Sequence, residues 1–102
     1  ALDVRKEEDA QRSRERGARA VLLTAIDDKN CLQTLNLYIK KTKARISEVA
    51  EKRGGQWAHT WSYSTVLREL VAEGVAGKKD VARKIGAKNL LEQLRAEANR
   101  SP

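Results

Sequence analysis

Three polar side chains alternate with apolar ones between residues 34 and 39, in the segment TLNLYI. Thr34, Asn36 and Tyr38 carry the hydroxyl and amide groups that hydrogen-bond to base edges in a DNA groove. Asn36 is the best candidate for a specific contact, because a side-chain amide can bond both N6 and N7 of adenine. These residues are therefore the predicted base contacts of a nucleic-acid-binding protein.

Cations follow directly, and a second polar cluster lies farther along the chain. Lysines beside a groove-reading segment would bind phosphates, which positions a protein on DNA without specifying sequence. A serine at position 62 is a suitable N-cap for a helix over 62–75, so the N–H groups of that helix start would also face a phosphate. The predicted phosphate contacts are Lys40, Lys41, Lys43, Ser62, Tyr63 and Ser64.

The spacing of apolar residues indicates the elements that would position these side chains. Residues 34–39 alternate as in a short strand. Residues 43–53 have the three- and four-residue spacing of a helix that ends at Gly54 and Gly55, and 62–75 have the spacing of a second helix. The alternative is that residues 32–52 form one long helix, since positions 32, 35 and 39 are apolar.

This order of strand, basic helix, turn and second helix resembles the ribbon-helix-helix DNA-binding proteins of the MetJ/Arc type. The resemblance rests on the strand TLNLYI, on the basic segment that ends in EKRGG, and on a second helix opened by Ser62 with Ser64 just inside it. It implies a homodimer whose two strands pair as a ribbon in the major groove. It also implies that the start of the second helix anchors the DNA backbone.

The predicted fold class is therefore mainly α with one short β-strand. It is a ribbon-helix-helix homodimer, with an intermolecular two-stranded antiparallel ribbon and extra N- and C-terminal helices. Residues 1–17 are almost wholly charged and are expected to form a mobile or helical arm. An apolar helix, or else a strand, and a connector occupy residues 18–30. The ribbon-helix-helix domain covers 31–77, and a basic C-terminal helix covers 78–102.

The charge distribution favours a polyanionic partner. The formal net charge is +7, and the excess lies in residues 31–58 and 78–102, each net +4. Lys and Arg that neutralise phosphates release condensed counterions, which stabilises a complex with nucleic acid. The 40 % of apolar residues include no Phe and no Met, which suits helix packing better than a large substrate pocket. With no phosphate-binding glycine loop or catalytic triad pattern, we expect no enzyme activity.

Single cysteine and histidine residues limit redox and metal chemistry. Cys31 cannot form an intramolecular disulfide, which fits a reducing compartment. His59 has no second histidine and no carboxylate cluster near it in the sequence, so we expect neither a metal nor another cofactor. No apolar run is long enough to span a membrane and the chain begins without a signal-peptide pattern, so we expect a cytoplasmic protein.

Together these features predict sequence-specific binding of double-stranded DNA by a homodimer. The resemblance implies a transcriptional repressor or a plasmid-type regulatory or accessory protein. One alternative is an all-α four-helix module that binds an acidic protein. Another is a helix-turn-helix-like nucleic-acid binder that acts through the C-terminal half, and residues 78–102 are also a candidate surface for a protein partner.

Overall fold

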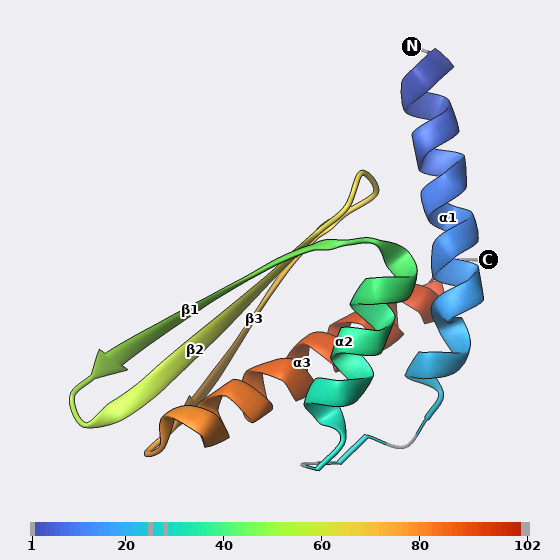
Figure 1. The fold of residues 1–102 in the computed structure, drawn as a ribbon. Coiled ribbons are helices and arrows are strands. Elements are labelled where there is room, and N and C mark those ends of the chain that lie inside the picture. The colour runs from blue at the N-terminus through green and yellow to red at the C-terminus, as the bar shows by residue number, and fades with distance from the viewer. Residues whose placement is uncertain (1, 25, 28, 101–102) are drawn as a thin grey trace.

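The computed structural model describes residues 2–24, 26–27 and 29–100. Within them the elements in chain order are α1 (Leu2–Leu22), α2 (Cys31–Thr42), β1 (Arg45–Arg53), β2 (Gln56–Ser64), β3 (Glu69–Ala76) and α3 (Lys79–Arg100). The strands form one antiparallel sheet in the order β1-β2-β3. Helices α2 and α3 lie on the same side of this sheet, and α1 packs beside α2 (Figure 1).

A tight turn joins β1 to β2. Arg53 pairs with Gln56 at the end of the ladder, which leaves Gly54 and Gly55 as the two turn residues. Their φ angles are +52° and +88°. Two-residue hairpin turns of this kind need positive φ at both positions, which glycine adopts without steric cost. The glycine pair therefore reverses the chain between two strands. The prediction that it ends a helix is wrong.

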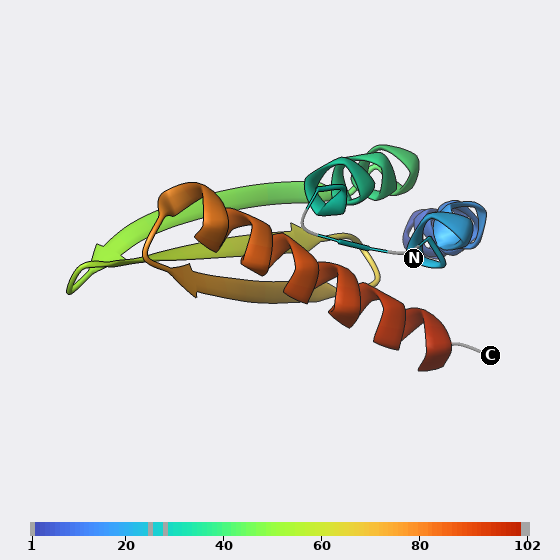
Figure 2. The ribbon, with the colours of Figure 1, turned by 90° about the horizontal axis from the view of Figure 1, so that it is seen from below.

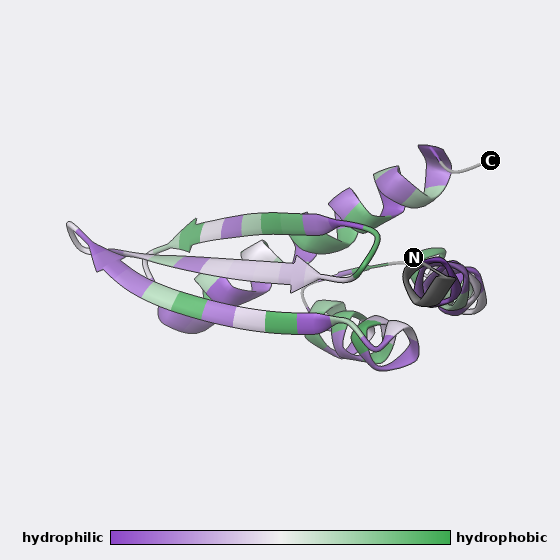
Figure 3. Cartoon of the chain, turned by 90° about the horizontal axis from the view of Figure 1, so that it is seen from above, coloured by the Kyte–Doolittle hydropathy of each residue, from purple (hydrophilic) through white to green (hydrophobic). Residues whose placement is uncertain are grey.

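The core lies between the helices and one face of the sheet. Side chains of β2 alternate, so Trp61 and Tyr63 point toward the helices and are each 1 % exposed. Along β1 the apolar residues are at positions 46, 49 and 50, so apolar and hydrophilic residues do not alternate regularly on this strand (Figure 3). The buried apolar residues that pack together are Ala18, Val21, Leu22, Cys31, Leu35, Tyr38, Trp61, Tyr63, Ala72, Ala87, Leu90, Leu91 and Leu94.

Two glycines let α3 approach β3 closely. A Cβ on Gly74 would collide with the backbone N of Gly86 and the carbonyl of Ala82. Two α3 side chains also bond the outer edge of β3, because Asn89 donates to the Glu73 carbonyl (2.8 Å) and Gln93 to the Val71 carbonyl (3.0 Å). The helix therefore covers this edge of the sheet, whereas no strand among the described residues pairs with the outer edge of β1.

The predicted strand over residues 34–39 is wrong, because this segment lies in α2. The buried residues of α2 follow the helical spacing i, i+3, i+4, i+7 and i+11, and they are Cys31, Thr34, Leu35, Tyr38 and Thr42. Leu37, which the strand would have buried, is 47 % exposed. The alternative helix from residue 32 is closer to the structure, but it ends at Thr42, where Lys43 takes a left-handed conformation (φ 53°).

The two predicted helices that follow are wrong as well. Residues 45–53 form β1, and residues 62–75 hold the end of β2, a turn and most of β3. Only Ile46 is partly buried along β1, so this strand has no apolar stripe that would have distinguished it from a helix. The predicted fold class, mainly α with one short strand in a ribbon-helix-helix dimer, is therefore overturned by the three-stranded sheet. The all-α bundle is overturned too.

Helices do lie at both ends of the described chain, as α1 and α3. The charged residues expected to form a separate arm belong to α1, which continues without a break through residues 18–22. This helix ends at Leu22, within the predicted segment 18–30, and Asp28 lies outside the described residues. Ser101 and Pro102, the last residues of the predicted segment 78–102, also lie outside them.

Candidate nucleic-acid interface

Unpaired lysines gather where the β1–β2 hairpin meets the start of α3. In Figures 1 and 2 the hairpin turn and the first turn of α3 lie at the same end of the sheet. The ammonium group of Lys79 lies 5.3 Å from the ring centroid of Trp57, so the two elements touch there. Lys52, the next-to-last residue of β1, lies on the same face of the sheet as Trp57, since the two are register partners. We call Lys52 and Lys79, together with Lys78 just before α3 and Lys84 farther along α3 beside the start of α2, the hairpin-end cluster.

The cluster is distinguished by its lack of counterions. Within the part of the chain that the structure describes, none of its four lysines forms an ion pair. Arg53, the next residue after Lys52, differs because it binds Glu51 (2.9 Å) and approaches Glu73 (4.0 Å) on the opposite face of the sheet. The lysines are therefore free to bind an external anion, and Arg53 is less so.

Arg83 also lies near the cluster, but its guanidinium group is bound to the carboxylate of Glu48. Its Nε donates to Glu48 Oε1 over 2.7 Å, and the same oxygen lies 2.8 Å from His59 Nε2. Trp61 donates its indole N–H to the Arg83 carbonyl (3.0 Å). Burial would raise the pKa of Glu48, but hydrogen bonds from Arg83 and His59 outweigh burial and lower it. This network holds α3 against β1 and β2.

The exposed face of α2 continues the basic surface. Its start adjoins α3, because Cys31 Sγ lies 3.7 Å from the Lys84 carbonyl. Gln33, Asn36 and Lys40 are exposed on α2, and no acidic residue occurs in residues 31–47. This face therefore offers amide groups and positive charge without competing carboxylates.

The outer face of the sheet has a different character. Its exposed residues include Glu51, Glu69 and Glu73 together with Arg45 and Arg53, so its charges are mixed. None of the aromatic rings lies on this face. Trp57, Trp61 and Tyr63 share the opposite face of β2, and Tyr38 packs against Tyr63 with ring centroids 6.3 Å apart. The sheet therefore offers no aromatic surface on which bases could stack.

The structure separates the three predicted base contacts. Thr34 and Tyr38 are buried in α2, at 9 % and 3 % exposure, and only Asn36 faces solvent. They belong to a helix, so no ribbon presents them to a groove. Lys40, Lys41 and Lys43 are exposed at the C-terminal end of α2, where they remain available to phosphates.

The predicted phosphate site at Ser62, Tyr63 and Ser64 loses its basis, because these residues lie in β2 and not at a helix start. Tyr63 is buried and its hydroxyl donates to Thr42 Oγ1 (3.4 Å). Burial raises the pKa of Tyr63 and of Tyr38, so both stay protonated at neutral pH. Their role is in the core.

The hairpin-end cluster was not among the sites predicted from the sequence. Its signals were the net charges of +4 in residues 31–58 and in residues 78–102, which located the excess but not the surface that it forms. Lys52 was assigned to a helix end, so its position beside Lys79 had no sequence counterpart. The Glu48–His59 contact was also missed, because it joins neighbouring strands.

Comparison with known proteins adds no assignment. No protein-family model matches this chain, and no curated protein matches it either. Nothing identifies it as a ribbon-helix-helix protein. Among the described residues, none of the helices has the length and apolar character needed to cross a bilayer. The same part of the chain has no group of three or more potential ligands that could hold a metal ion.

Proposed function

We propose that this protein binds double-stranded RNA through the hairpin-end cluster and the exposed face of α2. The observation that carries the proposal is a group of four lysines without ion pairs, from β1, the β3–α3 connection and α3, beside a helix face that has no acidic residue. Such a surface suits a polyanion, whose phosphates replace the missing counterions.

A duplex is favoured over a single strand. Proteins that bind single strands stack bases on exposed aromatic rings. Here Trp61, Tyr63 and Tyr38 are each at most 3 % exposed, and Trp57 is half-buried beneath Lys79. A surface of lysines and amides contacts the backbone of a duplex without needing its bases to unstack.

RNA is favoured over DNA because the fold has no protruding element that could enter the major groove of DNA. Reading the DNA major groove requires a protruding helix or two-stranded ribbon. Here α2 and α3 pack on the sheet, and the β1–β2 hairpin is held along its length by β3, up to the pair Trp57–Ala76. The wide, shallow minor groove of A-form RNA needs no insertion and displays 2′-hydroxyls, to which Gln33 and Asn36 would hydrogen-bond.

The order of elements supports the same choice. From α2 onward the chain runs helix, three antiparallel strands, helix, with both helices on one face. This order is like that of double-stranded-RNA-binding domains, which recognise duplex shape across two successive minor grooves and the phosphates between them. The likeness is one of arrangement. In this arrangement, α2 and the hairpin turn would each face a minor groove. Lys78 and Lys79 would contact the phosphates between the two grooves.

Sequence-specific binding of duplex DNA by a homodimer, which the sequence analysis predicted, depended on the intermolecular ribbon. Without that ribbon, neither the dimer nor a repressor role follows from the structure. Duplex DNA is therefore the first control in the test and not the proposed ligand.

The test compares three fluorescently labelled ligands of one sequence: an RNA duplex of about 20 base pairs, the matching DNA duplex and single-stranded RNA. We expect the RNA duplex to bind about tenfold more tightly than either control, with little dependence on its sequence. The logarithm of its affinity should fall linearly with the logarithm of salt concentration, with a slope of about −3 to −4 for four phosphate contacts. Equal binding to RNA and DNA duplexes would contradict the A-form assignment, and absence of salt dependence would contradict the phosphate contacts.

A further inference from the structure

A second basic surface lies at the other end of the sheet, away from the hairpin. It is a hollow of about 620 Å³ between α1, the connection from α2 to β1, and the turn that follows β2. The residues that line it are Lys6, Glu7, Ala10, Gln11, Arg14, Lys43, Arg45, Ser64, Thr65 and Val66. Four of these are cations and one is an acid. A volume of this size is in the range of small-molecule sites.

A buried glutamine holds one of these cations in place. Gln11 is 4 % exposed, and its Nε2 donates to the Thr42 carbonyl over 2.8 Å. Its Oε1 accepts a hydrogen bond from Arg14 Nη1 (2.9 Å). The glutamine therefore links the end of α2 to the guanidinium and fixes its direction. A cation oriented in this way loses less conformational entropy when it binds a ligand.

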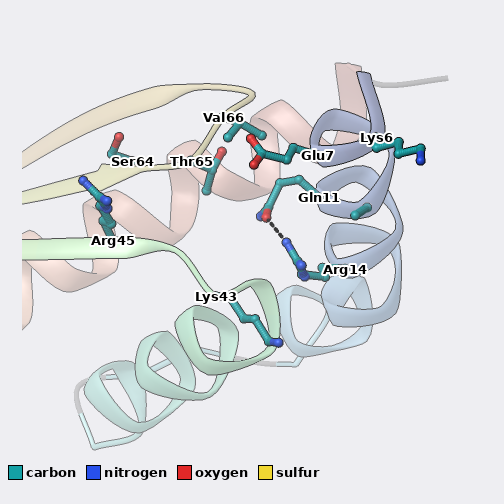
Figure 4. Close-up of a pocket in the computed structure, with 10 residues that line it drawn as sticks. Lys6, Glu7, Gln11, Arg14, Lys43, Arg45, Ser64, Thr65 and Val66 are labelled. Atoms are coloured by element: carbon teal, nitrogen blue, oxygen red, sulfur yellow. Dashed lines mark hydrogen bonds between the residues drawn. The ribbon is translucent and has the colours of Figure 1, made fainter. Parts of the chain in front are cut away.

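The backbone directs a second cation to the same space. Lys43 follows Thr42 and has a φ of 53°, a left-handed conformation that ends α2. In Figure 4, Arg14 and Lys43 point into the space between α1 and the connection, while Lys6 points away from it. Arg45 lies beside Ser64 at the rim.

No internal carboxylate neutralises these cations. Among the described residues, no ion pair involves Arg14, Lys43 or Arg45, and Glu7 is also unpaired. Two like charges held close together without a counterion repel each other, and the fold gains nothing from that arrangement. A bound anion would remove the repulsion and would accept hydrogen bonds from both groups.

We infer that this hollow binds the phosphate groups of a small, multiply phosphorylated molecule. Arg14 would bind one phosphate with its planar fork, as guanidinium groups do, and Lys43 would supply a point charge to the next phosphate. The Ser64 hydroxyl and Arg45 would contact the part of the ligand at the rim. This site shares no residue with the hairpin-end cluster, so it does not rest on the proposed binding of RNA.

The test is isothermal titration with inorganic tripolyphosphate at constant ionic strength. Arg14→Gln and Lys43→Gln should each weaken binding about tenfold, the loss expected for one charge-assisted contact. Arg14→Lys, which keeps the charge but loses the fork, should fall between Arg14→Gln and the wild type. Arg5→Gln and Lys41→Gln, which remove exposed cations outside the hollow, are the matched controls and should bind as the wild type does.

Gln11→Leu tests the positioning role of the glutamine. It should weaken tripolyphosphate binding several-fold while Arg14 itself is intact, and a melting curve will identify any loss of folding. Titration with an RNA duplex that carries a 5′-triphosphate distinguishes a free polyphosphate from the end of a nucleic acid. Failure of tripolyphosphate to bind, or equal binding by wild type, Arg14→Gln and Lys43→Gln, would overturn the inference. Lys78→Gln/Lys79→Gln should leave this titration unchanged even if the RNA proposal fails.

Discussion

Two regions of the molecule carry basic side chains. One is the interface of α1 with α2 and α3, which we call the seam, and the other is the hairpin end. The two regions differ in which basic residues they carry and in what those residues bind. At the seam, arginines bond to other parts of the chain. Arg68 binds Glu15 (3.0 Å) and Glu97 (3.2 Å), and Arg95 donates to the Leu22 carbonyl (2.9 Å). Arg19 donates to the Ala98 carbonyl. These arginines hold the long N-terminal helix and the β2–β3 turn to α3.

At the hairpin end the available cations are lysines, and they lack such partners. The two arginines close to them are bound to carboxylates, Arg53 to Glu51 and Arg83 to Glu48. The difference follows from chemistry, because a guanidinium presents a planar set of donors that can satisfy several fixed acceptors, whereas an ammonium group is a flexible point charge. Net charge alone therefore does not locate a binding surface. The cations that matter are those that the fold leaves without an acceptor.

The largest expected effect comes from removing a seam arginine. Arg68→Gln would remove the guanidinium that binds the carboxylates of Glu15 and Glu97, and the Glu15 side chain is only 16 % exposed. Breaking a buried ion pair costs more than an exposed one, and at this partial burial we expect a loss of about 2 kcal/mol in the free energy of unfolding. Urea denaturation measures it.

Arg53→Gln is the matched control at the hairpin end. Its side chain is 60 % exposed, so the same substitution should change the free energy of unfolding by less than about 0.5 kcal/mol. If Arg53→Gln destabilised the protein as much as Arg68→Gln, the distinction between structural and available cations would not hold.

The next effect is on binding and not on stability. Lys78→Gln/Lys79→Gln should weaken duplex RNA binding about tenfold and reduce the salt slope by about 2, because each lysine is expected to contact a phosphate. The melting temperature should fall only slightly, because neither lysine forms an ion pair among the described residues and the loss is limited to the exposed contact between Lys79 and the Trp57 ring. Anisotropy titrations at several salt concentrations measure both quantities.

The control for that variant is Arg5→Gln/Arg16→Gln, which removes two exposed cations from α1. An equal loss of affinity in the control would mean that binding depends on net charge alone. The hairpin-end cluster would then have no special role.

A smaller gain in affinity for duplex RNA is expected when Arg83 loses its negatively charged partner, Glu48. Glu48→Gln keeps hydrogen-bonding groups for Arg83 and His59 but removes a negative charge beside the cluster. We expect duplex RNA to bind about threefold more tightly, since a favourable charge change of this kind near a partly screened surface amounts to less than about 1 kcal/mol. Glu92→Gln, an exposed change farther along α3, is the control and should have less effect.

The smallest expected effects are changes in the free energy of unfolding with pH, and these changes have opposite signs at the hairpin end and at the seam. Hydrogen bonds from Arg83 and His59 outweigh burial and lower the pKa of Glu48 from its ordinary 4.5, so its stabilising contribution is present above pH 4.5 and is lost as pH falls through the lowered pKa. Burial raises the pKa of Glu15, despite Arg68 and Arg12. Its contribution is therefore greatest below pH 4.5 and is lost as pH rises through the raised pKa.

Free energies of unfolding between about pH 3 and pH 7 would show these signs. The difference between wild type and Glu48→Gln should increase with pH, and the difference between wild type and Glu15→Gln should decrease. Two curves that rise together would show that the carboxylates at the seam and at the hairpin end are in similar environments.

Part of the fold could be anticipated from the sequence, and the reason for the rest is physical. The C-terminal helix was predicted from the spacing of its apolar residues, and three of them, Leu90, Leu91 and Leu94, are buried on one helical face. The segment TLNLYI satisfied the strand period and the helix period equally well. The strand was predicted, wrongly, because Thr34 and Tyr38 were treated as exposed polar residues, although both are buried.

The sheet was missed because its first strand is almost wholly exposed. β1 carries no apolar stripe, and its side chains Ile46, Val49 and Ala50 match a helical face by spacing alone. The better signals were the alternation of His59, Trp61 and Tyr63 and the glycine pair before them, which together indicate a hairpin. The candidate site was out of reach for a related reason, since Lys52 and Lys79 come together only through the sheet register and the packing of α3.

The most direct test of the proposed interface is to follow backbone amide signals by NMR while duplex RNA is added. The largest shifts should occur at Asn36 in α2, at Lys52 beside the hairpin turn, and at Lys78 and Lys79 at the start of α3. Residues on the outer face of the sheet, such as Thr60 and Val71, should not move. Shifts confined to that outer face or to α1 would contradict the account.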